Sequence, residues 1–174
     1  EEITTGFHIQ DRDATGYSRV LQAISHRDEA SRYYRTAEYA GLASDQIAIS
    51  LDGITAWYER VCAKDPARKN QTVLLLDCDW QSTDLLVFVK DQLMFSRSIG
   101  IGVKHLTEQG IVMEGELLRE VQRSMEAAGP EMKGEKITHV MLTGMGEEVK
   151  NLLAVLSREL NLPCERIAPF REFE

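Results

Sequence analysis

Cysteine and positive charge are both scarce in this 174-residue chain. The three cysteines, Cys62, Cys78 and Cys164, are an odd number without metal-ligand spacing. They argue against a disulfide framework or a zinc site, and they favour reduced thiols in the cytoplasm. Lys and Arg number 20 against 28 Asp and Glu, which gives a net charge of −8, and neither half of the chain is basic. This balance excludes a surface for nucleic acid.

Long apolar runs are also absent. No run approaches the ~20 residues that cross a bilayer, and the first residues do not resemble a signal peptide, so we expect no direct membrane insertion. A hydrophobic content of 43% is still enough for the core of one domain or two small ones. Because the chain begins Glu1-Glu2-Ile3 without an initiator Met, we expect it to be part of a longer protein.

The apolar pattern predicts two units, residues 1–63 and 71–174, separated by a charged linker at 64–70 that contains Pro66 and lacks periodic apolar residues. In the first unit the pattern predicts strands over 7–9, 17–24 and 46–50 and two helices. The first helix begins near Asp28 and is closed by Gly41 in a left-handed conformation, and the second carries the apolar stripe Ile54, Trp57, Tyr58 and Val61.

The second unit begins with a predicted three-stranded meander. Its strands cover 73–77, 84–89 and 93–99, and a tight turn at 90–92 joins the last two. A helix around 117–125 that ends near Gly129, a buried strand over 137–143 and an amphipathic helix over 149–160 complete the unit. The pattern therefore predicts an α/β fold.

The first candidate site is the hairpin between the first two strands of this meander. A buried run ends in Asp77, a polar turn follows, and Thr83 precedes the next apolar run. Such a hairpin can offer a carboxylate and backbone N–H groups to a phosphate. In actin-like proteins the motif reads Asp-x-Gly-x-x-x-Thr, but Asp79 occupies the glycine position here. A carboxylate there places negative charge where the ligand is negative.

Further blocks make the resemblance specific to PilM-like type IV pilus assembly proteins of the actin-like ATPase superfamily. Residues 95–102 and 105–109 resemble the strand, the Gly-containing turn and the "LTE" helix start of that family. Residues 116–124 resemble its next helix, and 140–146 resemble its "LTGGG" adenosine loop. Residues 1–63 resemble the small SHS2-like (1C) subdomain, and 71–174 resemble a reduced 2A subdomain of the actin-like, ribonuclease H-like architecture.

The resemblance implies a cytoplasmic scaffold that lies at the inner membrane through its partners. It implies binding to the cytoplasmic tail of a PilN-like inner-membrane protein and coupling of that platform to a motor ATPase. ATP with Mg²⁺ would be the cofactor, with Asp77 positioning the metal through water. The residues implied to contact the nucleotide are Asp77, Asp79, Gln81, Ser82, Thr83, Glu120, Arg123, Gly144, Met145 and Gly146.

Departures from the family pattern favour a degenerate or partial ATP site, and we do not expect an active enzyme. The upstream half that supplies the first phosphate loop is absent, Asp79 replaces the phosphate-loop glycine, and Met145 interrupts the glycine run. The stretch between Gln109 and Glu116 leaves little room for a 2B subdomain.

Alternative interpretations remain for the residues and for the function. Asp77 can be a turn former, Glu120 and Arg123 an exposed ion pair, and 143–147 a simple strand-to-helix turn. The functional alternatives are the cytoplasmic actin-like domain of a type II secretion GspL-like protein, an FtsA-like filament protein, and an active ATPase or sugar kinase of the same superfamily. The last would need an intact phosphate-loop glycine.

Overall fold

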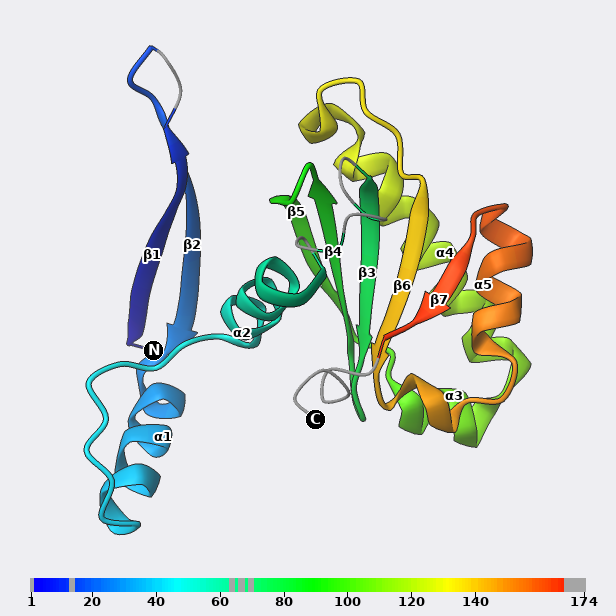
Figure 1. Ribbon diagram of the computed structural model, residues 1–174. Helices are drawn as coiled ribbons and strands as arrows, with labels where there is room; N and C mark the ends of the chain where they lie inside the picture. Colours follow the sequence, from blue (N-terminus) through cyan, green and yellow to red (C-terminus); the bar gives the residue numbers. More distant parts are fainter. Residues whose placement is uncertain (1, 13–14, 63–64, 66–67, 69–70, 168–174) are drawn as a thin grey trace. The chain divides into compact units, whose positions relative to one another are not determined.

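The computed structural model describes residues 2–12, 15–62, 65, 68 and 71–167, and the chain divides into two compact units, Glu1–Ile54 and Thr55–Glu174 (Figure 1). The sequence predicted a boundary after residue 63. The second unit instead begins at Thr55, because the ring of Tyr58 stacks on Phe88 of the large sheet at a centroid distance of 3.8 Å. Most of the predicted linker lies outside the described residues. Arg68, which is described, forms an ion pair with Glu165 at 3.2 Å.

The first unit is a two-stranded antiparallel ribbon followed by a helix. β1 (Ile3–Arg12) pairs with β2 (Ser18–His26), and α1 (Arg27–Tyr39) follows β2 without a loop. The left-handed conformation predicted for Gly41 is confirmed by its φ of +73°. The strand predicted at 46–50 is wrong: no described strand pairs with this segment, its apolar side chains are exposed, and α2 (Ser50–Trp57) begins at its last residue.

The second unit contains a five-stranded sheet in the order β5-β4-β3-β6-β7. The predicted meander is confirmed as β3 (Thr72–Cys78), β4 (Thr83–Val89) and β5 (Gln92–Ile99), which pair antiparallel. β6 (His139–Gly144) pairs parallel with β3, and β7 (Cys164–Arg166) pairs parallel with β6. The sequence did not predict β7, which is too short to show a periodic pattern.

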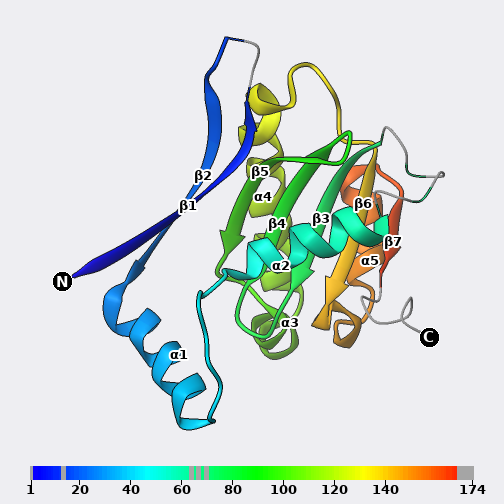
Figure 2. The ribbon, with the colours of Figure 1, turned by 60° about the vertical axis from the view of Figure 1, so that its left-hand side comes forward.

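Helices cover both faces of this sheet. α3 (Val103–Gln109), α4 (Ile111–Ala128) and α5 (Leu152–Leu160) pack on one face, where they share a core with Leu74 and Leu76. The helical segment from Thr55 through the π-helical turn Tyr58–Cys62 lies across the opposite face (Figure 2). Side chains on both faces of β3 are therefore buried, which explains the continuous apolar run of this strand. Among the described helices, none is both long and apolar enough to cross a membrane.

The Tyr58–Phe88 stack gives a prediction about stability. Tyr58 is 1% exposed, and its ring lies 12° from the plane of Phe88. We expect Tyr58→Ala to lower the free energy of unfolding by about 3–5 kcal/mol, because it removes a buried aromatic ring and leaves a cavity. Urea unfolding measures the change. Tyr33→Ala is the matched control, because Tyr33 is 69% exposed, and equal losses in the two variants would contradict the packing account.

Candidate functional site

The hairpin between β3 and β4 is closed by its own backbone. The paired ladder ends at Cys78 and Thr83, and the N–H of Asp79 donates to the carbonyl of Ser82 at 2.8 Å. The hydroxyl of Thr83 is buried, and it donates to the carbonyl of Ile101 at 2.7 Å. Thr83 therefore ties the hairpin to the segment that leads into α3.

The same loop also covers the amino terminus of α3. The N–H groups of Val103 and Lys104 donate to the carbonyls of Asp79 and Trp80 at 2.9 and 3.0 Å. Gly102 makes this approach possible, because a Cβ atom at that position would lie 2.5 Å from the backbone nitrogen of Ser82. The first N–H groups of α3 are thus used by the loop, and they do not offer a phosphate site.

Parallel pairing brings Asp77 next to the predicted adenosine loop. Asp77 lies opposite Thr143, and Cys78 lies opposite Gly144, in the β3–β6 register. Gly144 has a φ of +74°, and a Cβ atom there would lie 2.5 Å from Oδ1 of Asp77. Only glycine fits this position, on both conformational and steric grounds. Met145 and Gly146 follow in a short 3₁₀ helix, η3 (Met145–Glu148).

Negative charge gathers at this junction. Burial raises the pKa of the Asp77 carboxyl, and the neighbouring carboxylates of Asp84 and Asp79 raise it further. Asp84 is the cross-strand partner of Asp77. In the described part of the chain, no group of three or more His, Cys, Asp or Glu side chains could hold a metal ion. A phosphate would meet repulsion from carboxylates at this hairpin, so the residues present do not fit a nucleotide phosphate.

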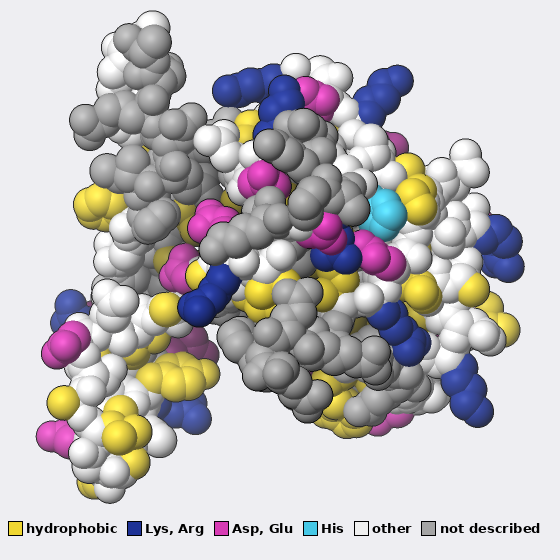
Figure 3. All heavy atoms as spheres, in the orientation of Figure 1, with side chains coloured by type: hydrophobic (Ala, Val, Ile, Leu, Met, Phe, Trp, Pro, Cys, Tyr) yellow, Lys and Arg dark blue, Asp and Glu magenta, His cyan; other side chains and the backbone are white. Residues whose placement is uncertain are grey.

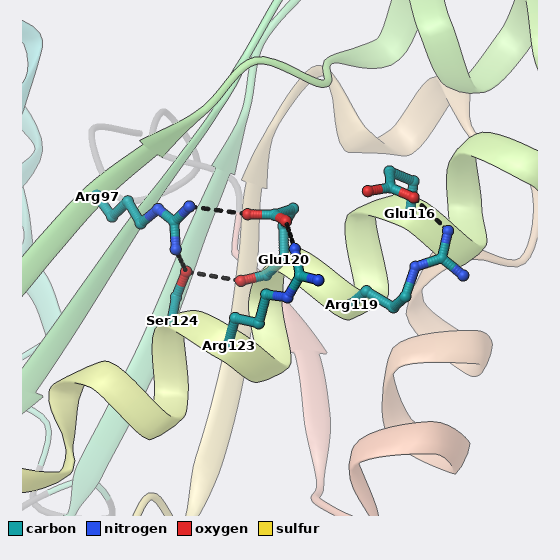
Figure 4. Close-up of polar contacts among 6 residues, drawn as sticks. All are labelled: Arg97, Glu116, Arg119, Glu120, Arg123 and Ser124. Atoms are coloured by element: carbon teal, nitrogen blue, oxygen red, sulfur yellow. Dashed lines mark hydrogen bonds and ion pairs between the residues drawn. The ribbon is translucent and has the colours of Figure 1, made fainter.

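Glu120 is ion-paired both with Arg123 of its own helix and with Arg97 of β5 (Figure 4). Glu120 forms ion pairs with Arg97 of β5 at 2.8 Å and with Arg123 at 2.6 Å, and the Ser124 hydroxyl donates to its carbonyl. These contacts lie at the β5 edge of the sheet, whereas Gly144 ends β6, on the far side of β4 and β3. The described contacts do not bring these two parts of the predicted site together.

Sequence reasoning missed two residues of this region. Gly102 belongs to a Gly-Ile-Gly segment that is too common to indicate a function, and its role depends on a loop twenty residues upstream. Arg97 lies on an edge strand and reaches Glu120, which is 23 positions further along the chain. The residues near each position in the sequence form no pattern that would predict either contact.

The raised pKa of Asp77 predicts how stability depends on pH. The folded protein holds the Asp77 proton more tightly than the unfolded chain, so ionisation of Asp77 destabilises the fold as pH rises above the ordinary carboxyl pKa of about 3.9. We expect Asp77→Asn to raise the unfolding midpoint at pH 7. The gain should shrink as pH falls towards that ordinary value. Glu108→Gln, at an exposed position of α3, is the control, and a gain that does not depend on pH would contradict this explanation.

Comparison with solved structures identifies the fold. A chain of the PilM–PilN type IV pilus biogenesis complex superposes with a TM-score of 0.80 at 18% sequence identity, covering 97% of this chain and 57% of that chain. MreB 5 of Spiroplasma citri, bound to AMPPNP, superposes with a TM-score of 0.56 at 13% identity, covering 82% of this chain and 60% of that one. No family model and no curated protein matches the sequence.

This chain spans a little over half the length of the pilus protein chain that it matches. The superposition nevertheless extends over nearly all of its own residues and therefore includes both units. The α/β architecture and the resemblance predicted from the sequence are confirmed: the chain has the actin-like fold that it shares with the PilM–PilN complex and with MreB.

Proposed function

We propose that this protein is a cytoplasmic scaffold of a type IV pilus assembly machine. The observation that carries the proposal is the superposition of 97% of the chain on a chain of the PilM–PilN complex. The match includes the small first unit as well as the second. The proposed partner is the cytoplasmic tail of a PilN-like inner-membrane protein, and the scaffold would couple that platform to a motor ATPase.

The proposed docking surface is the exposed side of α1. Tyr33 and Tyr39 are 69% and 89% exposed, and apolar side chains interspersed with charged ones are visible over this helix (Figure 3). Arg32 and Arg35 lie at helical spacing with Tyr39, on one side of α1. Tyrosine and arginine are enriched among the residues that contribute most to protein interfaces. Apolar anchors would supply affinity, and the two arginines would orient the tail.

Exposed apolar side chains in the first unit favour binding to a partner. None of its residues with a described side chain is buried, and both Phe7 and Ile24 are largely exposed on the ribbon. A small unit whose described side chains are not buried gains stability when another chain covers its apolar side chains. A membrane-protein tail bound there would hold the scaffold at the inner membrane, although the described chain has no spanning helix of its own.

The nucleotide site is proposed to be degenerate. MreB with the same fold is bound to AMPPNP, and in this chain the Asp77 carboxylate lies beside Gly144. The negative charge of Asp79 would repel a phosphate at the same hairpin. The Glu120 carboxylate already forms ion pairs with two arginines. ATP with Mg²⁺ would therefore bind weakly or not at all, and the protein would act by binding its partners.

Tail binding gives the main test. We expect Tyr39→Ala in the full chain to weaken binding of the tail peptide encoded by the neighbouring gene about tenfold, because an interface tyrosine contributes roughly 1.4 kcal/mol or more. Fluorescence anisotropy measures the affinity. Ile111→Ala removes an apolar side chain that is 85% exposed in the second unit, and it serves as the control. Equal effects of the two substitutions, or no saturable binding, would overturn the docking proposal.

The degenerate site gives a second expectation. The chain alone should release phosphate from Mg-ATP only at the background rate, because phosphoryl transfer requires positioning and neutralisation of the phosphates, and the hairpin adds negative charge. A phosphate-release assay measures the rate. Turnover above background that Asp77→Ala abolishes would show that the protein is an ATPase.

A further inference from the structure

The hairpin loop contains a hydrogen bond that conflicts with the phosphate-binding role implied by its sequence. The N–H of Trp80, in the turn of this loop, donates to Oδ1 of Asp79 at 2.7 Å. We propose that the Asp79 carboxylate is a built-in substitute for the phosphate, which keeps the loop in one conformation whether or not a nucleotide is present. This inference rests on the proposed degenerate site and explains what keeps the loop of that site in its conformation.

The first step of the argument is the chemistry of the loop. Successive backbone N–H groups in a turn form a positive concavity that binds anions. The carboxylate of Asp79 accepts a hydrogen bond from one of these groups, the N–H of Trp80. An internal ligand of this kind is present at a very high effective concentration, because the chain itself holds it in place.

The second step is that the remaining bonds of the loop do not need a ligand. The N–H of Asp79 donates to Ser82, and the carbonyls of Asp79 and Trp80 accept from the first N–H groups of α3. The Thr83 hydroxyl is committed to the carbonyl of Ile101. These hydrogen bonds connect the loop to α3 and to Ile101 without a ligand.

The third step is charge. An incoming phosphate would have to displace Asp79 from Trp80 and would then lie near Asp77 and Asp84 as well. Like charges in close contact repel each other at the effective dielectric of a protein surface. Displacement is thus unfavourable even before the lost hydrogen bond is counted.

Four variants of the full chain separate the hydrogen bond from the charge. Asp79→Asn keeps an acceptor oxygen and removes the charge, whereas Asp79→Ala and Asp79→Gly remove both. Glu108→Ala, on the exposed side of α3, is the control. The readout is the hydrogen-exchange rate of the Trp80 amide, measured by NMR with and without millimolar pyrophosphate.

We expect the Trp80 amide to be protected in the wild type, in Asp79→Asn and in the control, and to exchange at least tenfold faster in Asp79→Ala. Pyrophosphate should restore protection in Asp79→Ala and Asp79→Gly and leave the wild type unchanged. Equal exchange in the wild type and Asp79→Ala would overturn the proposal. So would pyrophosphate protection of the wild type, or a lack of protection by pyrophosphate in both variants. These outcomes do not depend on the partner, so a failure of tail binding is distinguishable from a failure of this inference.

Discussion

The pairing of β3 with β4 on one side and β6 on the other is the constraint on which the site depends. This register places the end of β3 beside the end of β6, so that the Asp77 carboxylate meets Gly144. The same strand is buried on both faces, which fixes its register, because a slip by one residue would exchange the two faces. A rigid central strand thus holds the hairpin loop against α3 with little freedom to rearrange.

The chemistry at this junction is dominated by charge and by internal hydrogen bonds. Burial and two neighbouring carboxylates make ionised Asp77 costly, and the loop uses most of its polar groups on itself. At the β5 edge, Arg97 and Arg123 occupy the carboxylate of Glu120 in a similar way. These internal contacts support the proposal that the protein presents surfaces to partners and does not perform phosphoryl transfer.

Periodicity and motif order were sufficient to predict the architecture, because the strands of the second unit are strongly apolar and their turns have clear signatures. The meander, the buried strand over 137–143 and the amphipathic helices follow from that pattern. The strand expected at 46–50 failed because exposed isoleucines alternate there without a neighbouring strand to pair with. Contacts such as Arg97 with Glu120, and Gly102 with the loop, depend on tertiary packing, so local spacing could not predict them.

We propose that this actin-like chain binds a membrane-protein tail and that its hairpin does not respond to nucleotide. The most direct measurement is the dissociation constant of the tail peptide for the full chain, determined by calorimetry with and without saturating Mg-ATP. The account predicts the same constant in both conditions. A tenfold change would correspond to a coupling free energy of about 1.4 kcal/mol between nucleotide and tail, and it would contradict the account.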